Sequence, residues 1–200
     1  ATTESDISHM SLRLAGMTTT ANFTQAEILG MAGAMSSLGI KAEAGGSVMT
    51  QIVANITKAV ANGSGAVEEY ARVSGMSADE FAAKWQSSPM EALESLIDGI
   101  NRLSNEGQAT DVTLTQLGIK SIRQADVMRR LSGNTDVLHE AIGRANSAWQ
   151  DNTALTEEVD KRNESLESRF QTLKNKADAA AIKIGGPLAE ALLDVADRLS

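Results

Sequence analysis

The sequence contains no cysteine, so disulfide bonds and thiolate metal sites are excluded, which fits a reducing compartment. Only two prolines occur, and aromatic residues make up 3% of the 200 residues. The core must therefore consist of small and flexible apolar side chains, a composition that favours helix. Because β-branched residues seldom alternate with polar ones over the length of a strand, no strand is predicted. We expect an all-α protein.

Positive charge is also scarce, because 18 lysines and arginines face 26 acidic residues and the net charge is -8. Phosphate binding depends on clustered basic side chains, so this balance argues against a general affinity for nucleic acid or anionic membranes. No apolar run approaches the roughly 20 residues of a membrane span, and the first residues do not resemble a secretion signal. The chain begins at Ala1 without an initiator Met and ends at Ser200 just after an amphipathic run. We expect it to be a fragment of a longer protein.

Motifs that carry chemistry are missing as well. The only histidines, His9 and His139, lie far apart and neither has a second ligand four residues away, so we predict no metal site and regard His139 as an ordinary helix residue. No nucleophile elbow, phosphate-binding loop or dinucleotide fingerprint is present. Adjacent carboxylates on a helix, such as Glu157 and Glu158, point about 100° apart and cannot flank one bond. We therefore predict no catalytic, cofactor-binding or metal-binding residues, no cofactor, no small-molecule substrate and no enzyme activity.

The main feature that the chain does have is a repeated stretch. Residues 38–49 (LGIKAEAGGSVM) return as residues 117–128 (LGIKSIRQADVM), with six of twelve positions identical. In each copy a glycine, Gly39 or Gly118, follows the end of a stretch with helical periodicity. Glycine adopts the left-handed conformation that ends many helices. Each copy is therefore predicted to be a helix, a glycine corner and a second helix, a unit that scaffolds or binds.

Capping signals and apolar periodicity predict the helices of residues 1–152, which we expect to form a compact domain. Ser-Pro at residues 88 and 89 is the strongest predicted start, because Pro at the first helical position loses no hydrogen bond. Residues 1–22 are predicted to form either an irregular lead-in segment or a short helix. The remaining predicted features are capping boxes at Thr24–Glu27 and Ser77–Glu80, caps at Asp111, Ser121 and Asn134 or Thr135, and flexible corners at Gly45-Gly46 and Gly63-Ser64-Gly65.

The character of the chain changes after this domain. Residues 155–184 contain no glycine or proline and are rich in charge, and their apolar stripe is thin. Residues 153–185 are therefore predicted to form one long charged helix that lies along a groove or projects toward a partner. Gly185-Gly186-Pro187 ends it, and residues 186–200 are predicted to begin a further amphipathic helix.

Residues 113–131 also have the rhythm of a helix-turn-helix DNA-binding module, with a short helix, a glycine corner and a helix that carries Arg123, Arg129 and Arg130. Together with Lys120, these side chains could face a DNA groove. The acidic chain argues against this interpretation, and so does the first copy of the repeat, which has no arginine. DNA binding stays open as an alternative function.

Several stretches, taken in their order along the chain, carry a family resemblance: residues 29–60, 75–81 and 88–93, the second corner at Leu117, and the Asn-and-Lys-containing run from Asn175 to Gly185. Together they resemble the core region of phage tail tape measure proteins of the lactococcal-phage type, over nearly the whole chain. In that family a helix that ends in a Leu-Gly-Ile or Ala-Gly-Ile corner is followed by a small-residue segment and another amphipathic helix. One departure is Pro187, which follows two glycines directly, whereas the family places its proline a few residues later.

The resemblance implies a structural virion protein of a phage or prophage. The parent chain of such a protein lies in the tail lumen, has a length that sets tail length, and is released during DNA delivery. The implied partners are tail tube and assembly chaperone proteins, with self-association through the long helix, and the implied location is the virion tail after synthesis in the bacterial host cytoplasm. No catalytic residues are implied here, because cell-wall hydrolase modules, where the family has them, are separate domains.

Overall fold

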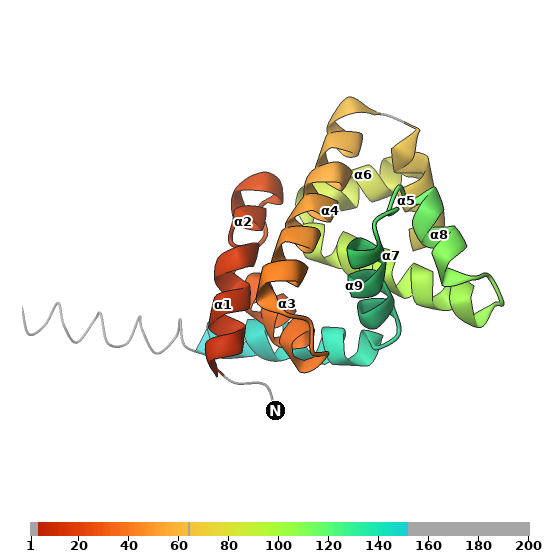
Figure 1. The fold of residues 1–200 in the computed structure, drawn as a ribbon. Helices are drawn as coiled ribbons and strands as arrows, with labels where there is room; N and C mark the ends of the chain where they lie inside the picture. Colours follow the sequence, from red (N-terminus) through yellow and green to blue (C-terminus); the bar gives the residue numbers. More distant parts are fainter. Residues whose placement is uncertain (1–3, 64, 152–200) are drawn as a thin grey trace, which may run out of the picture. The chain divides into compact units, whose positions relative to one another are not determined.

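The computed structural model describes residues 4–63 and 65–151, and its regular elements are all helices (Figure 1). No strand occurs among these residues, so the all-α prediction is confirmed. The helices predicted for residues 153–185 and 186–200 lie outside the described part. The elements are α1 (Glu4–Leu14), α2 (Gly16–Ala21), α3 (Gln25–Ser37), α4 (Ala42–Asn62), α5 (Ala66–Ser74), α6 (Ala78–Ser87), α7 (Pro89–Asn105), α8 (Thr110–Gln116) and α9 (Ile122–Ser132), followed by a helix over residues 135–151.

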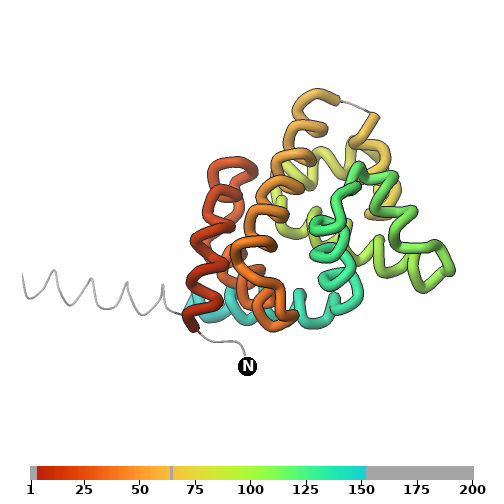
Figure 2. Tube along the Cα trace, viewed as in Figure 1, coloured from red at the N-terminus to blue at the C-terminus, as the bar shows by residue number. Residues whose placement is uncertain are grey.

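The helix α4 is the central element of this unit, which ends at Trp149. It packs against α1 and α2 on one side and against α5, α6 and α9 elsewhere (Figure 1). The helices α5, α6 and α7 pack against one another, and α7 also contacts α8 and α9. Along the chain trace, the 135–151 helix returns to the early helices, and its backbone at Ile142 lies against Gly30 of α3 (Figure 2). Residues far apart in sequence therefore share one core.

That core is built mainly from methionine, leucine and isoleucine. The largest fully buried side chains are Phe81, Met10, Leu14, Met17, Met31, Met35, Met49, Ile56, Met90, Leu93, Leu96 and Ile97. Four aromatic residues form a row, with Tyr70 stacked on Phe81, Phe81 stacked on Trp85, and the edge of Phe23 on Trp85, at centroid distances of 6.1 to 6.2 Å. The indole nitrogen of Trp85 is satisfied by a 3.2 Å hydrogen bond to the hydroxyl of Thr57.

The predicted capping boxes form at both positions, because the Thr24 and Ser77 hydroxyls accept the N–H of the glutamate three residues later and that glutamate accepts the N–H of the cap residue. Two other N-caps differ from the prediction, one in its side-chain hydrogen bond and one in its position. Ser88 is the N-cap of α7, as predicted, but its side chain accepts no capping hydrogen bond. The prediction for Asp111 is wrong, since Ala109 is the N-cap of α8 and Asp111 lies inside the helix.

The prediction of a flexible corner at Gly45-Gly46 is also wrong, because both glycines are buried inside α4. Gly46 lies where α1 crosses α4, and Gly45 lies against Ile40 and against Met35 of α3. A Cβ atom added to Gly46 would lie 2.3 Å from Cβ of Arg13, and one added to Gly45 would lie 2.3 Å from Cγ2 of Ile40. The second predicted corner is correct at Gly63, which ends α4 with a left-handed φ of 57°.

Candidate functional site

The two glycine corners of the repeat are real joints with the same backbone geometry. Gly39 has a φ of 71° and Gly118 a φ of 76°, and each follows the last turn of a helix. The N–H of Ile40 or Ile119, just after the glycine, donates to the carbonyl five residues earlier at 2.9 or 2.8 Å. The N–H of each glycine donates to the carbonyl three residues earlier at 3.0 Å. Both corners are therefore Schellman motifs, and the prediction of a corner in each copy is confirmed.

Of the other shared residues of the repeat, the valine and the methionine face the core, whereas Lys41 and Lys120 are exposed. The Val-Met pair is buried in both copies, at Val48-Met49 in α4 and at Val127-Met128 in α9. The helix after the corner begins one residue later in the second copy, where Ser121 is the N-cap and accepts the N–H of Gln124 at 3.1 Å. In the first copy Lys41 is the N-cap and makes no side-chain capping bond. The identical positions thus define the joint and the inward face.

Each corner is tied to the rest of the protein through the carbonyl of its leucine. The Leu38 carbonyl accepts a hydrogen bond from Nη1 of Arg130 at 3.2 Å, and Arg130 belongs to the helix of the second copy. The Leu117 carbonyl accepts one from the buried Tyr70 hydroxyl at 3.4 Å. Since α4 also packs against α9, the two copies of the repeat lie against each other.

A small groove of about 250 Å³ lies between the two copies, beside Gly39 and Ile40. Its charged lining consists of Lys41, Arg123, Arg130 and Asp126. Nε of Arg130 holds Oδ2 of Asp126 at 3.0 Å, so the only carboxylate of the groove is already paired with one of its cations. A groove with this lining can contact a charged or polar group, but it offers no activated nucleophile.

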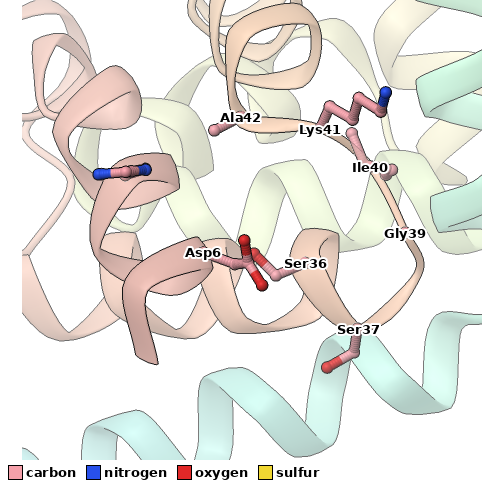
Figure 3. Close-up of a pocket in the computed structure, with 8 residues that line it drawn as sticks. Asp6, Ser36, Ser37, Gly39, Ile40, Lys41 and Ala42 are labelled. Atoms are coloured by element: carbon pink, nitrogen blue, oxygen red, sulfur yellow. The ribbon is translucent and has the colours of Figure 1, made fainter. Parts of the chain in front are cut away.

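A second pocket, of about 390 Å³, lies on another side of the first corner, between α1, the end of α3 and the start of α4 (Figure 3). Its lining includes Asp6, His9, Ser36 and Ser37, which are the residue types of a hydrolytic triad. A triad requires a hydrogen bond between the nucleophile and its base. Among the described residues no such bond joins His9 to Ser36 or Ser37, and His9 is exposed on α1. The arrangement therefore supports no catalytic assignment.

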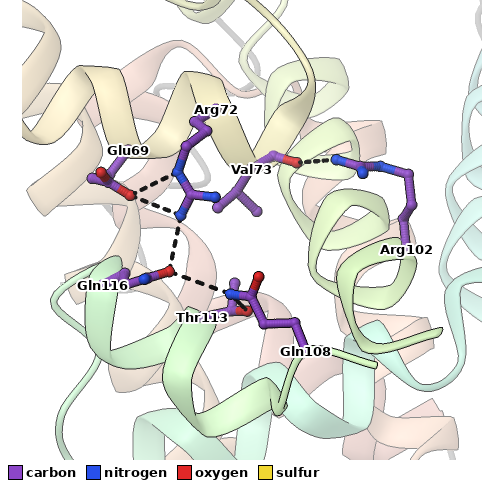
Figure 4. Close-up of polar contacts among 7 residues, drawn as sticks. All are labelled: Glu69, Arg72, Val73, Arg102, Gln108, Thr113 and Gln116. Carbon is purple, nitrogen blue, oxygen red and sulfur yellow. Dashed lines mark hydrogen bonds and ion pairs between the residues drawn. The ribbon is translucent and has the colours of Figure 1, made fainter. Parts of the chain in front are cut away.

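A polar network holds α8 on α5 close to the second corner (Figure 4). Glu69 accepts two hydrogen bonds from Arg72, and Nη2 of Arg72 also donates to Oε1 of Gln116 at 2.9 Å. The amide of Gln108 donates to the same oxygen at 3.3 Å and to the buried hydroxyl of Thr113 at 2.8 Å. Burying the Thr113 hydroxyl would be costly without this partner. The network is therefore a structural tie between helices.

The arginines of the helix-turn-helix alternative are partly occupied within the protein. Nε of Arg129 lies 3.4 Å from a carboxylate oxygen of Asp111, and Arg130 is held by Asp126 and by the Leu38 carbonyl. Lys120 and Arg123 are exposed. Two of the three arginines predicted to face DNA are thus paired with an aspartate of this chain.

A contact that the sequence did not reveal involves His139. Its Nδ1 lies 2.9 Å from Oε1 of Glu94, and its Nε2 lies 2.9 Å from Oδ1 of Asp98. Glu94 and Asp98 are one turn apart on α7, so they present two carboxylates to one imidazole. Only the four-residue spacing of the two acids is visible in the sequence, and nothing in it indicates that His139 lies opposite them.

These two carboxylates and the imidazole perturb one another's protonation. Burial lowers the pKa of His139, but the hydrogen bonds and negative charges of Asp98 and Glu94 raise it by more, and the net shift is upward. Burial raises the pKa of Glu94 above its usual value, and His139 only partly offsets this. The group favours a doubly protonated imidazolium, which donates from both nitrogens and has no free nitrogen for a metal ion.

Across residues 4–63 and 65–151, no group of three or more histidine, cysteine or acidic side chains is placed to hold a metal ion. Within the same residues, no helix is both long and apolar enough to cross a membrane. Comparison with models of known protein families finds no match, and searches among curated proteins and solved structures find none either.

Proposed function

We propose that this chain is a structural segment of a phage or prophage tail tape measure protein, which scaffolds tail assembly and contributes to tail length. The observation that supports this proposal is the position of the motifs that carry the family resemblance. The two Leu-Gly-Ile stretches are helix corners, Ser77 caps α6, and Pro89 is the first residue of α7. The resemblance therefore concerns residues that determine architecture, as expected for a protein that works through packing.

In this proposal the parent chain occupies the tail lumen and is released when DNA is delivered. Its partners are tail tube and assembly chaperone proteins, and the long charged helix predicted for residues 153–185 is the segment proposed for self-association. The protein is made in the host cytoplasm and ends in the virion tail. The helical unit that ends at Trp149 contributes joints and exposed helix faces to these contacts.

The ruler role is tested by changing chain length in the parent phage. In-frame deletion of residues 155–184 removes thirty residues, or about 45 Å if they are helical in the tail. We expect tails to be shorter by about this length in electron micrographs. The matched control replaces the same residues with an unrelated helical sequence of equal length, which should restore the original tail length. Unchanged tails after the deletion would exclude a ruler role for this segment.

Helix-turn-helix DNA binding is the alternative, and the exposure of Lys120 and Arg123 at the start of α9 is the observation that favours it. Recognition helices contact base edges through their first residues. A mobility-shift assay at moderate salt separates the two functions. Binding that is lost in the double variant Lys120→Ala, Arg123→Ala, but retained in the control Arg144→Ala, would support the alternative. If the protein shifts no DNA duplex at that salt concentration, the result argues against DNA binding and the structural role remains the proposal.

A further inference from the structure

The 135–151 helix is joined to α7 by polar contacts of His139 with Glu94 and Asp98. Both imidazole nitrogens are used, and each faces a carboxylate from a different turn of α7 at 2.9 Å. The Glu94 side chain is 16% exposed, whereas His139 and Asp98 remain close to half exposed. The imidazole can therefore exchange protons with solvent, while one of its two partners is held in a largely dry position.

The other charged groups around His139 do not compete for its nitrogens. On α7, the negative charge of Glu91 raises the pKa of Glu94. A carboxylate oxygen of Glu91 lies 3.5 Å from Nζ of Lys84 in α6. On the helix of His139 itself, Glu140 is paired with Arg144 and Asp136 is exposed.

The remaining elements that approach this helix add little charge. In α3, which contacts it at Gly30, the one charged side chain is Glu27, and Glu27 is engaged in its own capping box. The neighbouring α9 carries Arg129 and Arg130, each of which is paired with an aspartate. The electrostatics of the contact are therefore those of one imidazole and two carboxylates.

We propose that His139 is a proton-operated latch that holds the 135–151 helix on α7 when the imidazole carries two protons and releases its hold when it carries one. The latch is independent of the proposed tape measure function. The buried Leu138 and Ile142 also hold this helix in the core, so release of the latch would weaken the attachment of the last described helix to α7 without removing its apolar contacts.

The chemistry of the two protonation states explains why the contact is a latch. The imidazolium donates one N–H to Glu94 and the other to Asp98, so both carboxylates accept a charge-assisted hydrogen bond. The neutral imidazole keeps one N–H and presents a lone pair at its other nitrogen. That lone pair then faces a carboxylate oxygen at hydrogen-bonding distance, and Glu94 loses the positive charge that compensated its burial.

The direction of the pH effect follows from the pKa shifts. Since the pKa of His139 is raised by folding, its contribution to stability is complete below about pH 6.5, the value of a free histidine, and is lost as the pH rises through the raised pKa. The pKa of Glu94 is also raised, so its contribution is likewise complete at acidic pH and is lost as the pH rises. The variant His139→Gln therefore has to separate the contribution of His139 from that of Glu94.

The test measures titration and helix opening on the full 200-residue chain. Proton NMR of the imidazole Cε1–H signals gives the two histidine midpoints, and the variant His9→Gln assigns them. We expect the His139 midpoint to lie above about 6.5, the value of a free histidine, and Asp98→Asn to lower it. Amide hydrogen exchange, corrected for the intrinsic pH dependence of exchange, then reports the opening of the 135–151 helix between about pH 6 and pH 8.5.

Linkage makes the two measurements check each other. If His139 regains the midpoint of a free histidine, about 6.5, when the helix opens, the total loss of protection must equal ten raised to the difference between the two midpoints. We expect this loss in the wild type and in His9→Gln, and pH-independent protection over the same range in His139→Gln. Amides at the centre of α4 serve as an internal reference that should not change.

Three results would overturn the proposal. The first is a His139 midpoint at or below about 6.5, the value of a free histidine. The second is a raised midpoint with protection of the 135–151 helix that does not change with pH, which would make the contact a surface ion pair without a mechanical role. The third is the same pH-dependent loss in His139→Gln as in the wild type, because the proton would then bind elsewhere.

Discussion

The substitution Gly99→Ala is the sharpest test of the way in which α5 crosses α7. A Cβ atom added to Gly99 would lie 1.8 Å from the carbonyl oxygen of Val73 and 2.6 Å from its carbonyl carbon. Ordinary contact begins near 3.4 Å, so the two helices would have to separate by 3.4 − 1.8 = 1.6 Å at this point. The obstacle is backbone in the last turn of α5, which cannot move aside as the end of a side chain can.

The expected cost follows from two opposing effects. Overpacking of a core typically costs about 1 to 3 kcal/mol, and a backbone clash of this size belongs at or above the upper end. Replacing a helical glycine by alanine stabilises the helix by about 1 kcal/mol, because alanine has the higher helix propensity. We therefore expect a net loss of about 2 to 3 kcal/mol in the free energy of unfolding. With a urea m-value of about 2 kcal/mol/M, the unfolding midpoint falls by about 1 M or more.

The control is Gly33→Ala, in the helix α3, where an added Cβ meets nothing within 4 Å. Only helix propensity acts there, and we expect a gain of about 0.5 to 1 kcal/mol. Urea unfolding followed by circular dichroism compares both variants with the wild type. If Gly99→Ala unfolds at the same urea concentration as Gly33→Ala, the close crossing of α5 and α7 is refuted.

The remaining predictions concern helix ends and use the same unfolding assay. Ser77→Ala should cost about 1 kcal/mol because its hydroxyl forms a capping box, whereas Ser88→Ala should cost less than about 0.5 kcal/mol because its hydroxyl makes no capping bond, and equal losses would contradict the observed caps. Gly39→Ala and Gly118→Ala should each cost about 1 to 2 kcal/mol, since both positions are left-handed, and a neutral result at either would mean that its corner is not fixed.

The sequence predicted the features that depend on neighbours along the chain. A Schellman corner is closed by hydrogen bonds that span five residues, so the glycine and its flanking periodicity were sufficient to locate it at Gly39 and Gly118. The capping boxes at Thr24 and Ser77 span three residues and were predicted for the same reason. Local bonds of this kind need no knowledge of which helix lies opposite.

The features that sequence analysis missed depend on distant partners. Gly45-Gly46 has the composition of a flexible turn, and only the close approach of Arg13 to Gly46 and of Ile40 to Gly45 explains why it is a buried piece of helix. Gly99 gave no signal because Val73 lies on another helix. Asp111 has the side chain of a cap but is paired with Arg129 across the α8 and α9 interface. In each case the local sequence allowed several structural roles for the residue, and a tertiary contact determined which role it has.

The same distinction applies to the His139 contact. The distance from His139 to Glu94 and Asp98 depends on the register of the 135–151 helix against α7, and a shift of one residue would rotate the imidazole by about 100° away from both acids. Apolar periodicity predicts the buried face of such a helix, here Leu138 and Ile142. It does not predict the register of the helix along α7. The helix could thus be predicted, whereas its polar contact could not.

The two copies of the repeat show how one joint acquires two different roles. The shared leucine, glycine and isoleucine produce the same corner in both copies, and the shared valine and methionine are buried in both. Between these positions the copies differ. The first has Gly46, whose missing side chain allows α1 to approach, and Gly45, which makes room for Ile40. The second has Arg123 and Asp126, which face the groove between the copies. The identical residues form the joint, and the residues that differ determine which parts of the protein pack beside each joint. The similarity of the two copies therefore indicates a common architecture and not a common binding partner.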